Sequence, residues 1–181
     1  MILIIGKSAL ANELSQCMPD ATLVGRPEYD LLTQASCDQL INQFNPTLLI
    51  NTHAVNENHN PWDIITVNYT SIVYLTLGFY KKMQSGHIIN ISSTSTYWPS
   101  YPDIKTGRLC YNISKESLSA FGRHFNRHSV DHKNKPMVST IELGKFNSKF
   151  NNFSGGMSIK KAASVVKSCI DNPVTSISII K

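Results

Sequence analysis

The stretch "MILIIGKSALANELSQCM", residues 1–18, decides the fold class of this chain. It begins with a short apolar run and turns at Gly6, after which Leu10, Leu14 and Met18 recur at intervals of four. A continuous apolar run is typical of a buried strand, and a spacing of four is typical of one face of a helix. The stretch therefore predicts a buried strand that leads directly into a helix.

The same alternation continues along the chain. Further strands are predicted at residues 21–24, 47–50 and 87–92, in "KPMVSTIELG" and in "TSISIIK". Helices are predicted in "SCDQLINQFN", at residues 61–83, at residues 111–128 after a loop that runs to 109, and in "SIKKAASVVKSCIDN". Strands that alternate with helices favour an α/β fold, a three-layer doubly wound parallel sheet, here with about seven strands. No repeat or interior linker divides the chain, so we expect a single domain over residues 1–181.

Composition limits the function classes. Hydrophobic residues make up 41% of the 181 residues and charged residues 16%, as in globular proteins. The net charge of +5 suits anionic partners without choosing among them, and the basic stretch 123–135 is only a weak signal for nucleic acid. The apolar run at residues 1–5 is too short to span a membrane, and the four cysteines are dispersed. We expect a soluble cytoplasmic protein with free thiols and with no membrane or nucleic-acid partner.

The turn after the first strand is a candidate phosphate-binding site. In doubly wound sheets ligands bind beyond the carboxyl ends of the strands, where a helix N-terminus offers free N–H groups. Gly6 permits a tight turn, but the usual dinucleotide fingerprint has three glycines, and Ala9 and Asn12 occupy the other two places. A plain strand–turn–helix therefore stays open as an alternative. The candidate cofactor-binding residues of this turn are Gly6, Lys7, Ser8, Ala9 and Leu10.

Arg26 follows the second strand, 20 residues after Gly6. At about this separation, dinucleotide-binding folds carry an acid for the adenosine ribose or an arginine for a 2′-phosphate. A guanidinium suits phosphate because it can make two parallel hydrogen bonds. The sequence thus favours NADP over NAD, with a solvated turn arginine as the alternative. Asp30 is a candidate partner for the adenine amino group, or else a cap for the following helix.

Tyr111 and Lys115 lie one helical turn apart in "CYNISKESLSAF", residues 110–121. A phenol with a pKa of about 10 is a poor acid–base catalyst at neutral pH. A nearby ammonium group favours the phenolate and lowers that pKa. The pair therefore suits a proton donor and the cation that tunes it, although an ordinary surface pair has the same spacing.

These residues together resemble the short-chain dehydrogenase/reductase superfamily. "YNISK" matches its YxxxK motif, "INISS" (89–93) resembles the strand with its catalytic serine, and "VNYTS" (67–71) resembles the helix with its structural asparagine. "LINTHAV" (49–55) stands where the family has Asn-Asn-Ala-Gly or Asn-Ala-Ala-Ala. "ELGKFNS" (142–148) is similar to its Pro-Gly-x-x-x-Thr segment, with Leu143 in place of proline. The resemblance implies a Rossmann fold that binds NAD(P).

The branch of the superfamily stays open. Ser93 precedes Tyr97 by four residues, as in the extended branch of epimerases and dehydrorhamnose-type reductases. The separation of 18 positions from Ser93 to Tyr111 is also longer than the classical branch usually has. However, the chain is too short for the C-terminal sugar-binding region of the extended branch.

The resemblance also implies roles for the catalytic candidates. Tyr111 would donate the proton, and Lys115 would tune it and bind the nicotinamide ribose. Ser93 would hold the substrate carbonyl, and Asn68 would order a water linked to Lys115.

Further cofactor contacts follow from the same resemblance. Gly144 and Ser148 would approach the nicotinamide carboxamide and a phosphate, and Asn51 and Ala54 would line the adenosine side. His53 is unusual there, and a satisfied buried histidine is its alternative reading. The candidates at this strand end are Asn51, Thr52, His53 and Ala54.

We therefore predict an NADP(H)-dependent oxidoreductase that acts on a small carbonyl or alcohol substrate. By resemblance it would form a dimer or tetramer through helices 61–83 and 111–128. A decayed Rossmann module that binds a nucleotide or a protein partner is the alternative, and Asn12 favours it. His124, His128 and His132 recur every four residues, but no carboxylate or cysteine completes a metal site, so no metal is expected.

Overall fold

A computed structural model describes residues 1–94, 106–128, 134–148, 155–174 and 176–179. These residues contain six parallel strands, in the order β2-β1-β3-β4-β5-β6 across one sheet. The strands are β1 (Ile2–Ile5), β2 (Ala21–Val24), β3 (Leu48–Asn51), β4 (His87–Ser93), β5 (Met137–Leu143) and β6 (Ser176–Ile179). The α/β class is confirmed, but the described residues hold six strands where about seven were predicted. After β2 the chain crosses to the other side of β1, where β3 pairs with it. In the described residues β2 and β1 therefore lie on one side of the crossover, and β3 to β6 lie on the other.

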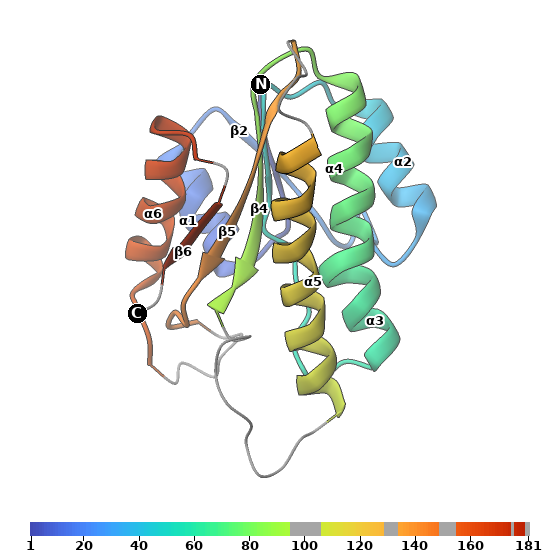
Figure 1. Ribbon diagram of the computed structural model, residues 1–181, viewed down its shortest axis with the longest axis vertical. Coiled ribbons are helices and arrows are strands. Elements are labelled where there is room, and N and C mark those ends of the chain that lie inside the picture. Colours follow the sequence, from blue (N-terminus) through green and yellow to red (C-terminus); the bar gives the residue numbers. More distant parts are fainter. Residues whose placement is uncertain (95–105, 129–133, 149–154, 175, 180–181) are drawn as a thin grey trace.

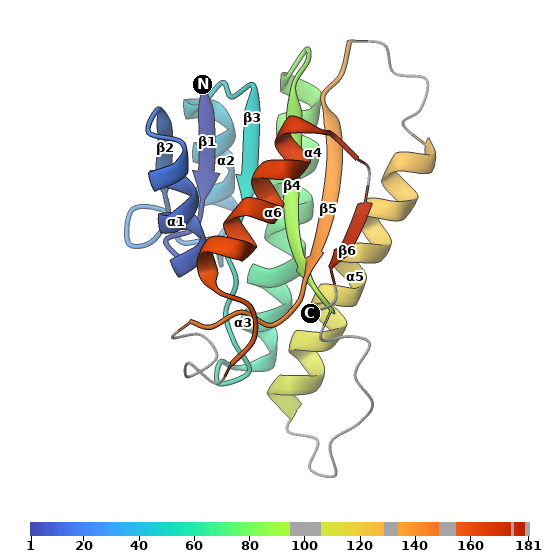
Figure 2. The same ribbon diagram turned by 90° about the vertical axis from the view of Figure 1, so that its left-hand side faces the viewer.

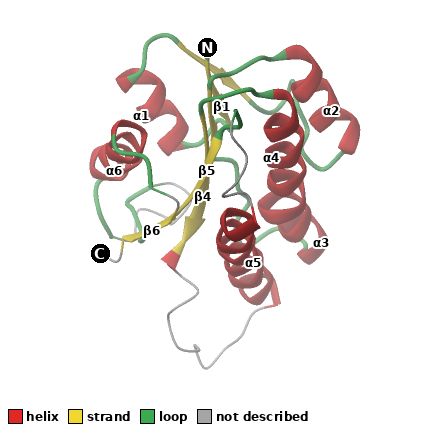
Figure 3. Ribbon diagram, turned by 45° about the horizontal axis from the view of Figure 1, so that its top comes forward, coloured by secondary structure: helices red, strands yellow, loops and turns green. Residues whose placement is uncertain are grey.

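Helices cover both faces of the sheet (Figures 1 and 3). On one face lie α1 (Ala9–Cys17) and α6 (Ile159–Asp171), and on the other α2 (Gln34–Gln43), α4 (Ser71–Lys82) and α5 (Thr106–His128). The two core layers alternate along each strand, so that Ile4 packs toward α1 and α6 while Leu3 and Ile5 pack toward α2 and α4. This burial on both faces explains the continuous apolar runs in the sequence.

The strands end at two levels. In the register of the sheet, Ile5 at the end of β1 lies beside Val24 of β2 and Asn51 of β3. β4 and β5 continue beyond this level and end side by side at Ser93 and Leu143. Ligands of doubly wound sheets bind outside the carboxyl ends where the strand order reverses, which here is between β1 and β3. The longer β4 therefore carries Ser93 past the ends of the two strands that flank this point.

Two helix boundaries differ from the prediction. Residues 61–83 form α3 (Pro61–Ile65), a π-helical turn η1 (Thr66–Thr70) and α4, rather than one regular helix. α5 begins at Thr106, within the predicted loop, so Tyr111 lies in its second turn. Side-chain caps fix the starts of other helices. At the start of α1, for example, Ser8 Oγ accepts from Ala11 N at 3.1 Å. In the described residues, no helix combines the length and apolar character needed to cross a bilayer.

α5 packs closely on the end of the sheet that carries the site (Figure 2). Leu118 and Ser114 are completely buried, and Gly122 faces Thr140 of β5. A β-carbon added at Gly122 would overlap the Thr140 hydroxyl oxygen. The glycine therefore sets how closely the helix approaches β5.

We expect Gly122→Ala to lower the free energy of unfolding by about 1–3 kcal/mol, the usual cost of overpacking. Thr140→Ala removes the oxygen that the new methyl group meets, so the double variant should lose less than the sum of the two single changes. Urea unfolding measures all three, with the exposed Glu116→Ala on the same helix as the control. A Gly122→Ala protein as stable as the original would contradict this account of the packing.

Candidate active site

Tyr111 lies close to Ser93 at the carboxyl edge of the sheet. A hydrogen bond joins their side chains. Burial raises the pKa of Tyr111 from 10.0 to about 12, against the opposite effects of the Ser93 hydrogen bond and the Arg108 charge, while Glu57 raises it further. A phenol with this pKa is protonated at neutral pH, as a proton donor must be.

Lys115 is buried beside β4, with only 3% of its surface exposed. Its Nζ donates to the Ile91 carbonyl oxygen at 3.0 Å, and burial lowers its pKa from 10.5 to about 8. The helix backbone is anchored at the same place, because Ser92 Oγ donates to the Lys115 carbonyl at 2.7 Å. The charge of Arg108 lowers the pKa of Tyr111 and that of Glu57 raises it, while the tuning role of Lys115 stays a prediction.

Asn68 lies in the π-helical turn and is completely buried. Its Oδ1 accepts from Val55 N at 2.8 Å, and its Nδ2 donates to Val55 O at 2.9 Å. The Asn68 amide thus pairs with both the N–H and the carbonyl of Val55, as the backbone of a neighbouring strand would. The resemblance implies that Asn68 orders a water, and this role stays a prediction. In the structure the Asn68 side chain fixes the loop after β3.

His53 is buried directly after β3, and its position in the site is well defined. Ser71 Oγ donates to the Val67 carbonyl at 2.9 Å, so it accepts from His53 Nε2, which lies at 3.2 Å. Burial, and then the charge of Lys115, lowers the pKa of His53 from 6.5 to about 3. Hydrogen bonds to the backbone of Ile5 and Val67 favour the protonated ring and partly oppose the effect of burial on its pKa.

The phosphate turn is built around a close backbone contact. Gly6 has φ +119°, and a β-carbon there would lie 2.7 Å from both His53 N and Thr52 Oγ1. Ala11 is completely buried in the core, whereas Asn12 is exposed on α1. Asn12 is bulkier than the glycine of the fingerprint, but its side chain lies on the exposed side of α1. The neighbouring Ala11 occupies the position that packs in the core.

Several cofactor candidates have side chains that are engaged within the protein. Leu10 is in the core, Ser8 caps α1, and Thr52 Oγ1 donates to Ile5 O at 3.0 Å. Asn51 Nδ2 donates to Asn90 Oδ1 at 2.8 Å between neighbouring strands. Any contact of these residues with a ligand would therefore come mainly from their backbone.

The residues after β2 line one corner of this edge. Arg26 is exposed, and the backbone of Lys7 approaches so closely that a β-carbon on Gly25 would lie 3.2 Å from Lys7 N. Lys7 Nζ pairs with Glu28 at 2.6 Å. Asp30 accepts from Leu32 N at 3.2 Å in a turn.

The N-cap of α2, the helix after this turn, is not Asp30, which was one of the two predicted roles of that residue. Thr33, not Asp30, caps α2 and accepts from Ser36 N at 3.3 Å. The capping alternative for Asp30 is thus wrong, and its role toward adenine stays a prediction.

The remaining cofactor candidates lie at the other strand ends. Ala54 is partly buried in the loop after β3, and Gly144 is buried after β5. Ser148 is only 3% exposed, and its Oγ has no hydrogen-bond partner in the described part of the chain. A buried hydroxyl of this kind fits a polar atom of a bound molecule.

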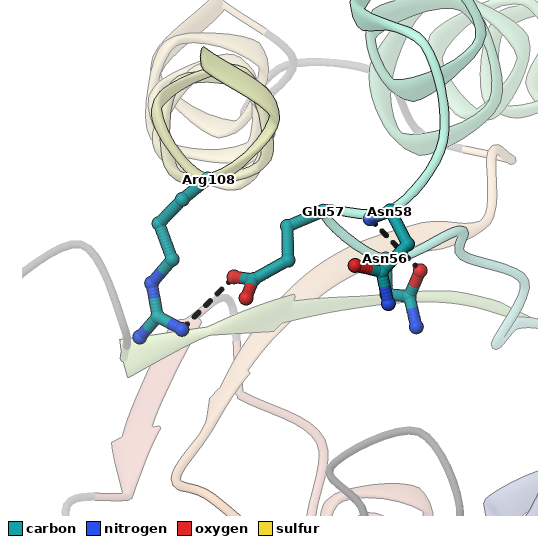
Figure 4. A network of polar contacts seen from close by, with 4 residues as sticks. All are labelled: Asn56, Glu57, Asn58 and Arg108. Atoms are coloured by element: carbon teal, nitrogen blue, oxygen red, sulfur yellow. Dashed lines mark hydrogen bonds and ion pairs between the residues drawn. The ribbon is translucent and has the colours of Figure 1, made fainter. Parts of the chain in front are cut away.

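The sequence analysis missed an ion pair beside Tyr111. Arg108 Nη1 lies 2.9 Å from Glu57 Oε2, and their side chains are 40% and 33% exposed (Figure 4). The sequence held no helical signal for Arg108, because residue 108 was predicted to lie in a loop, whereas in the structure it shares a face of α5 with Tyr111 three residues later. Glu57 lies in a loop far from α5 in the sequence, so no local pattern pointed to it.

Some predictions fall outside the described residues. Tyr97 and His132 lie there, as does the side chain of His128, so neither the Ser93–Tyr97 relation nor the histidine stack is tested. Among the side chains that the structure does describe, no group of three or more His, Cys, Asp or Glu residues is placed to hold a metal ion.

Comparison with solved structures shows the fold of short-chain dehydrogenases/reductases. A short-chain dehydrogenase/reductase from Vibrio parahaemolyticus superposes with a TM-score of 0.79 at 17% identity, over 99% of both chains. A short chain dehydrogenase from Burkholderia cenocepacia J2315, in complex with NADP, gives 0.80 at 13% identity over 98% of this chain and 87% of that one. The 3-alpha-hydroxysteroid dehydrogenase from Pseudomonas sp. B-0831, complexed with NADH, gives 0.78 at 14% identity over 99% and 94%.

The sequence identity to these three structures is only 13–17%. No protein-family model matches the chain, and no curated protein matches it. The structural likeness therefore rests on the arrangement of strands and helices that the sequence pattern predicted.

The buried ammonium of Lys115 should make stability depend on pH. Its pKa is about 8 in the folded protein, against 10.5 without burial, so the unfolded chain binds more protons between these values. Raising the pH from 7 to 9.5 should therefore stabilise the folded protein by about 2 kcal/mol relative to Lys115→Met. Urea unfolding of both proteins at the two pH values measures this difference, and a constant difference would contradict the lowered pKa.

His53 should make the protein sensitive to acid. Its pKa falls from 6.5 to about 3 on folding, so the unfolded chain takes up a proton that the folded chain excludes between these values. Lowering the pH from 7.5 to 5 should cost the wild-type protein about 2 kcal/mol that His53→Ala does not lose. The exposed His59→Ala is the control and should keep the wild-type loss. Equal losses in all three proteins would show that His53 is not held neutral.

Proposed function

We propose that this protein is an NADP(H)-dependent oxidoreductase of the short-chain dehydrogenase/reductase type, which transfers hydride between nicotinamide and a small carbonyl or alcohol substrate. The observation that carries the proposal is the hydrogen-bonded Ser93–Tyr111 pair with Lys115 one turn further along α5. These groups stand at the carboxyl edge of the sheet, beside the Gly6 turn. That edge is where doubly wound sheets bind their ligands.

The residues around the Gly6 turn fit a dinucleotide. The first N–H groups of α1 have no partner within the helix and point toward this edge, as at other phosphate-binding helix starts. Gly6 keeps the backbone close to Thr52 and His53, where a side chain would intrude. The buried Ser148 Oγ, which has no hydrogen-bond partner in the described part of the chain, is a polar atom that a bound cofactor would satisfy.

Two observations support NADP over NAD. Arg26 is exposed directly after β2, and Lys7 approaches the same corner. We assign the 2′-phosphate mainly to Arg26, because its guanidinium can make two parallel hydrogen bonds to a phosphate. The solved structures with this fold include a short chain dehydrogenase in complex with NADP, a dehydrogenase complexed with NADP+ and one complexed with NADH.

The chain's own residues would perform the proton chemistry. NADPH supplies hydride when it is bound. Ser93 holds the substrate carbonyl oxygen by a hydrogen bond, and Tyr111 gives its phenolic proton to that oxygen as negative charge develops there. The Lys115 backbone carbonyl accepts from Ser92 Oγ and its Nζ donates to the Ile91 carbonyl, so the ammonium is held at β4 and buried rather than in solvent.

The Ser93, Tyr111 and Lys115 set opposes the binding-module alternative, whereas Asn12 in the phosphate turn is the feature that favours it.

We further propose that the protein forms a homo-oligomer through α4 and α5. Leu77 of α4 and Leu109 and Ile113 of α5 are exposed by 38%, 47% and 45%, and these apolar side chains would be covered in such an assembly.

Titration with NADPH and NADH by calorimetry tests the cofactor assignment. We expect NADPH to bind more tightly than NADH, because only NADPH carries the 2′-phosphate. Arg26→Ala should weaken NADPH about 10-fold to 100-fold, as expected for hydrogen bonds to a charged group, and leave NADH unchanged. Arg127→Ala, an exposed arginine near the far end of α5, is the matched control.

Two outcomes decide the proposal. Failure of both cofactors to bind at millimolar concentration would overturn it. If NADPH binds, Tyr111→Phe should keep that binding and lower the rate of carbonyl reduction by about 100-fold or more, because it removes the proton donor.

A further inference from the structure

An ion pair lies beside Tyr111, and the proposed chemistry does not use it. Arg108 Nη1 and Glu57 Oε2 are 2.9 Å apart, and each charge acts on the phenol of Tyr111. Arg108 precedes Tyr111 by three residues and shares its helix face. The guanidinium is therefore near the atom that receives or gives the proton.

The position of Arg108 within α5 is unfavourable by itself. It is the third residue of the helix, whose first turn contains no acidic residue. The partial positive charge of a helix N-terminus disfavours a cation in the first turn. An anion placed there gains from both the guanidinium and the helix terminus, so this is a place where the fold favours a negative group.

The loop that carries Glu57 is held against the helix. A β-carbon on Gly107 would overlap the Glu57 carbonyl oxygen, so the loop and helix backbones are in direct contact. Asn56 folds the loop back on itself, with its Oδ1 accepting from Asn58 N and its carbonyl from His59 N, both at 3.2 Å. Figure 4 shows Glu57 extended from this turn toward Arg108.

The contact between Glu57 and Arg108 shows that the guanidinium is oriented to meet a carboxylate. An ion pair that is partly open to solvent contributes at most about 1 kcal/mol, so a second carboxylate can compete with Glu57 or join it. Arginine matches carboxylates because its planar group presents parallel N–H donors. Glu57 thus keeps the guanidinium oriented while leaving it open to exchange.

We propose that Arg108 binds a carboxylate group of the substrate, so that the enzyme reduces oxo acids in preference to neutral ketones and aldehydes. This inference rests on the proposed function. In the reaction, the carbonyl carbon gains hydride from NADPH and its oxygen gains the Tyr111 proton, which gives a hydroxy acid and NADP+. The carboxylate is unchanged, and Arg108 exchanges no proton; it orients the carbonyl toward Ser93 and Tyr111.

Matched acids and esters test the preference. We would measure kcat/KM with NADPH for a panel of 2-, 3- and 4-oxo acids and their methyl esters. At least one acid should exceed its ester by about 10-fold to 100-fold, the range for hydrogen bonds between charged groups. Arg108→Gln should remove this advantage, so that the ratio of acid to ester kcat/KM falls to about 1, whatever the change in Tyr111 does to both rates. Arg108→Lys should restore part of the ratio, since lysine keeps the charge but not the fork.

Glu57→Gln gives an effect in the opposite direction. It removes the competing carboxylate, so the KM of the preferred acid should fall while kcat changes little. A purely structural ion pair would instead make Arg108→Gln and Glu57→Gln equally damaging to acids and esters. Thermal unfolding of each variant, with Arg127→Gln as a control arginine on the same helix, separates loss of fold from loss of recognition.

Binding without turnover separates this inference from the proposed function. Oxamate titrated calorimetrically onto the complex with NADP+ should bind to the wild-type protein and bind at least about 10-fold more weakly to Arg108→Gln. Ester reduction that equals acid reduction across the panel would overturn the role of Arg108 and leave the oxidoreductase standing. If no carbonyl is reduced, oxamate binding that depends on Arg108 would still support the carboxylate site, and oxamate binding that is absent or independent of Arg108 would overturn it. Loss of NADPH binding would overturn the proposed function instead.

Discussion

The two hydrogen bonds between the Asn68 amide and the backbone of Val55 determine the geometry of this end of the molecule. A buried amide that meets both polar atoms of one residue satisfies a loop that would otherwise leave them unpaired. The loop after β3 is thereby fixed to the π-helical turn. His53 lies two residues before this contact and Glu57 two residues after it. One interaction therefore places both the histidine under the phosphate turn and the carboxylate that meets Arg108.

The polar groups buried along this edge have few charges of opposite sign near them. Lys115 has a carbonyl oxygen as its partner and His53 a hydroxyl, and burial lowers the pKa of both side chains. Burying the Lys115 ammonium without a carboxylate lowers the stability of the folded protein, and His53 avoids a similar cost by staying neutral. Titratable groups with such shifted pKa values are found more often at functional sites than elsewhere, which supports the proposed site.

The sequence predicted the fold class because its signals are local. Apolar runs marked both-face burial of β1, β3 and β4, and the spacing of four marked the helices. Tyr111 and Lys115 were recognisable because their separation on a helix is fixed. What the sequence could not show depended on contacts between distant segments: the Glu57–Arg108 pair, the Asn68–Val55 contact and the burial of Ala11 in place of Asn12. The predicted strand segments number six, as do the strands in the described residues, so the expected total of about seven exceeded what the local patterns indicated.

The charges around Tyr111 explain why the phenol needs more than one cation. Burial raises its pKa to about 12, which keeps the proton on the phenol but makes the phenolate left after transfer costly. In this structure Arg108 is the cation that opposes this cost, and Glu57 partly cancels it. A substrate carboxylate on Arg108 would cancel it further unless Lys115 then acted on the phenolate. In the proposed reaction the two cations would have separate roles. Arg108 would hold the substrate carboxylate, and Lys115, whose Nζ meets the Ile91 carbonyl, would stabilise the phenolate after the proton has left.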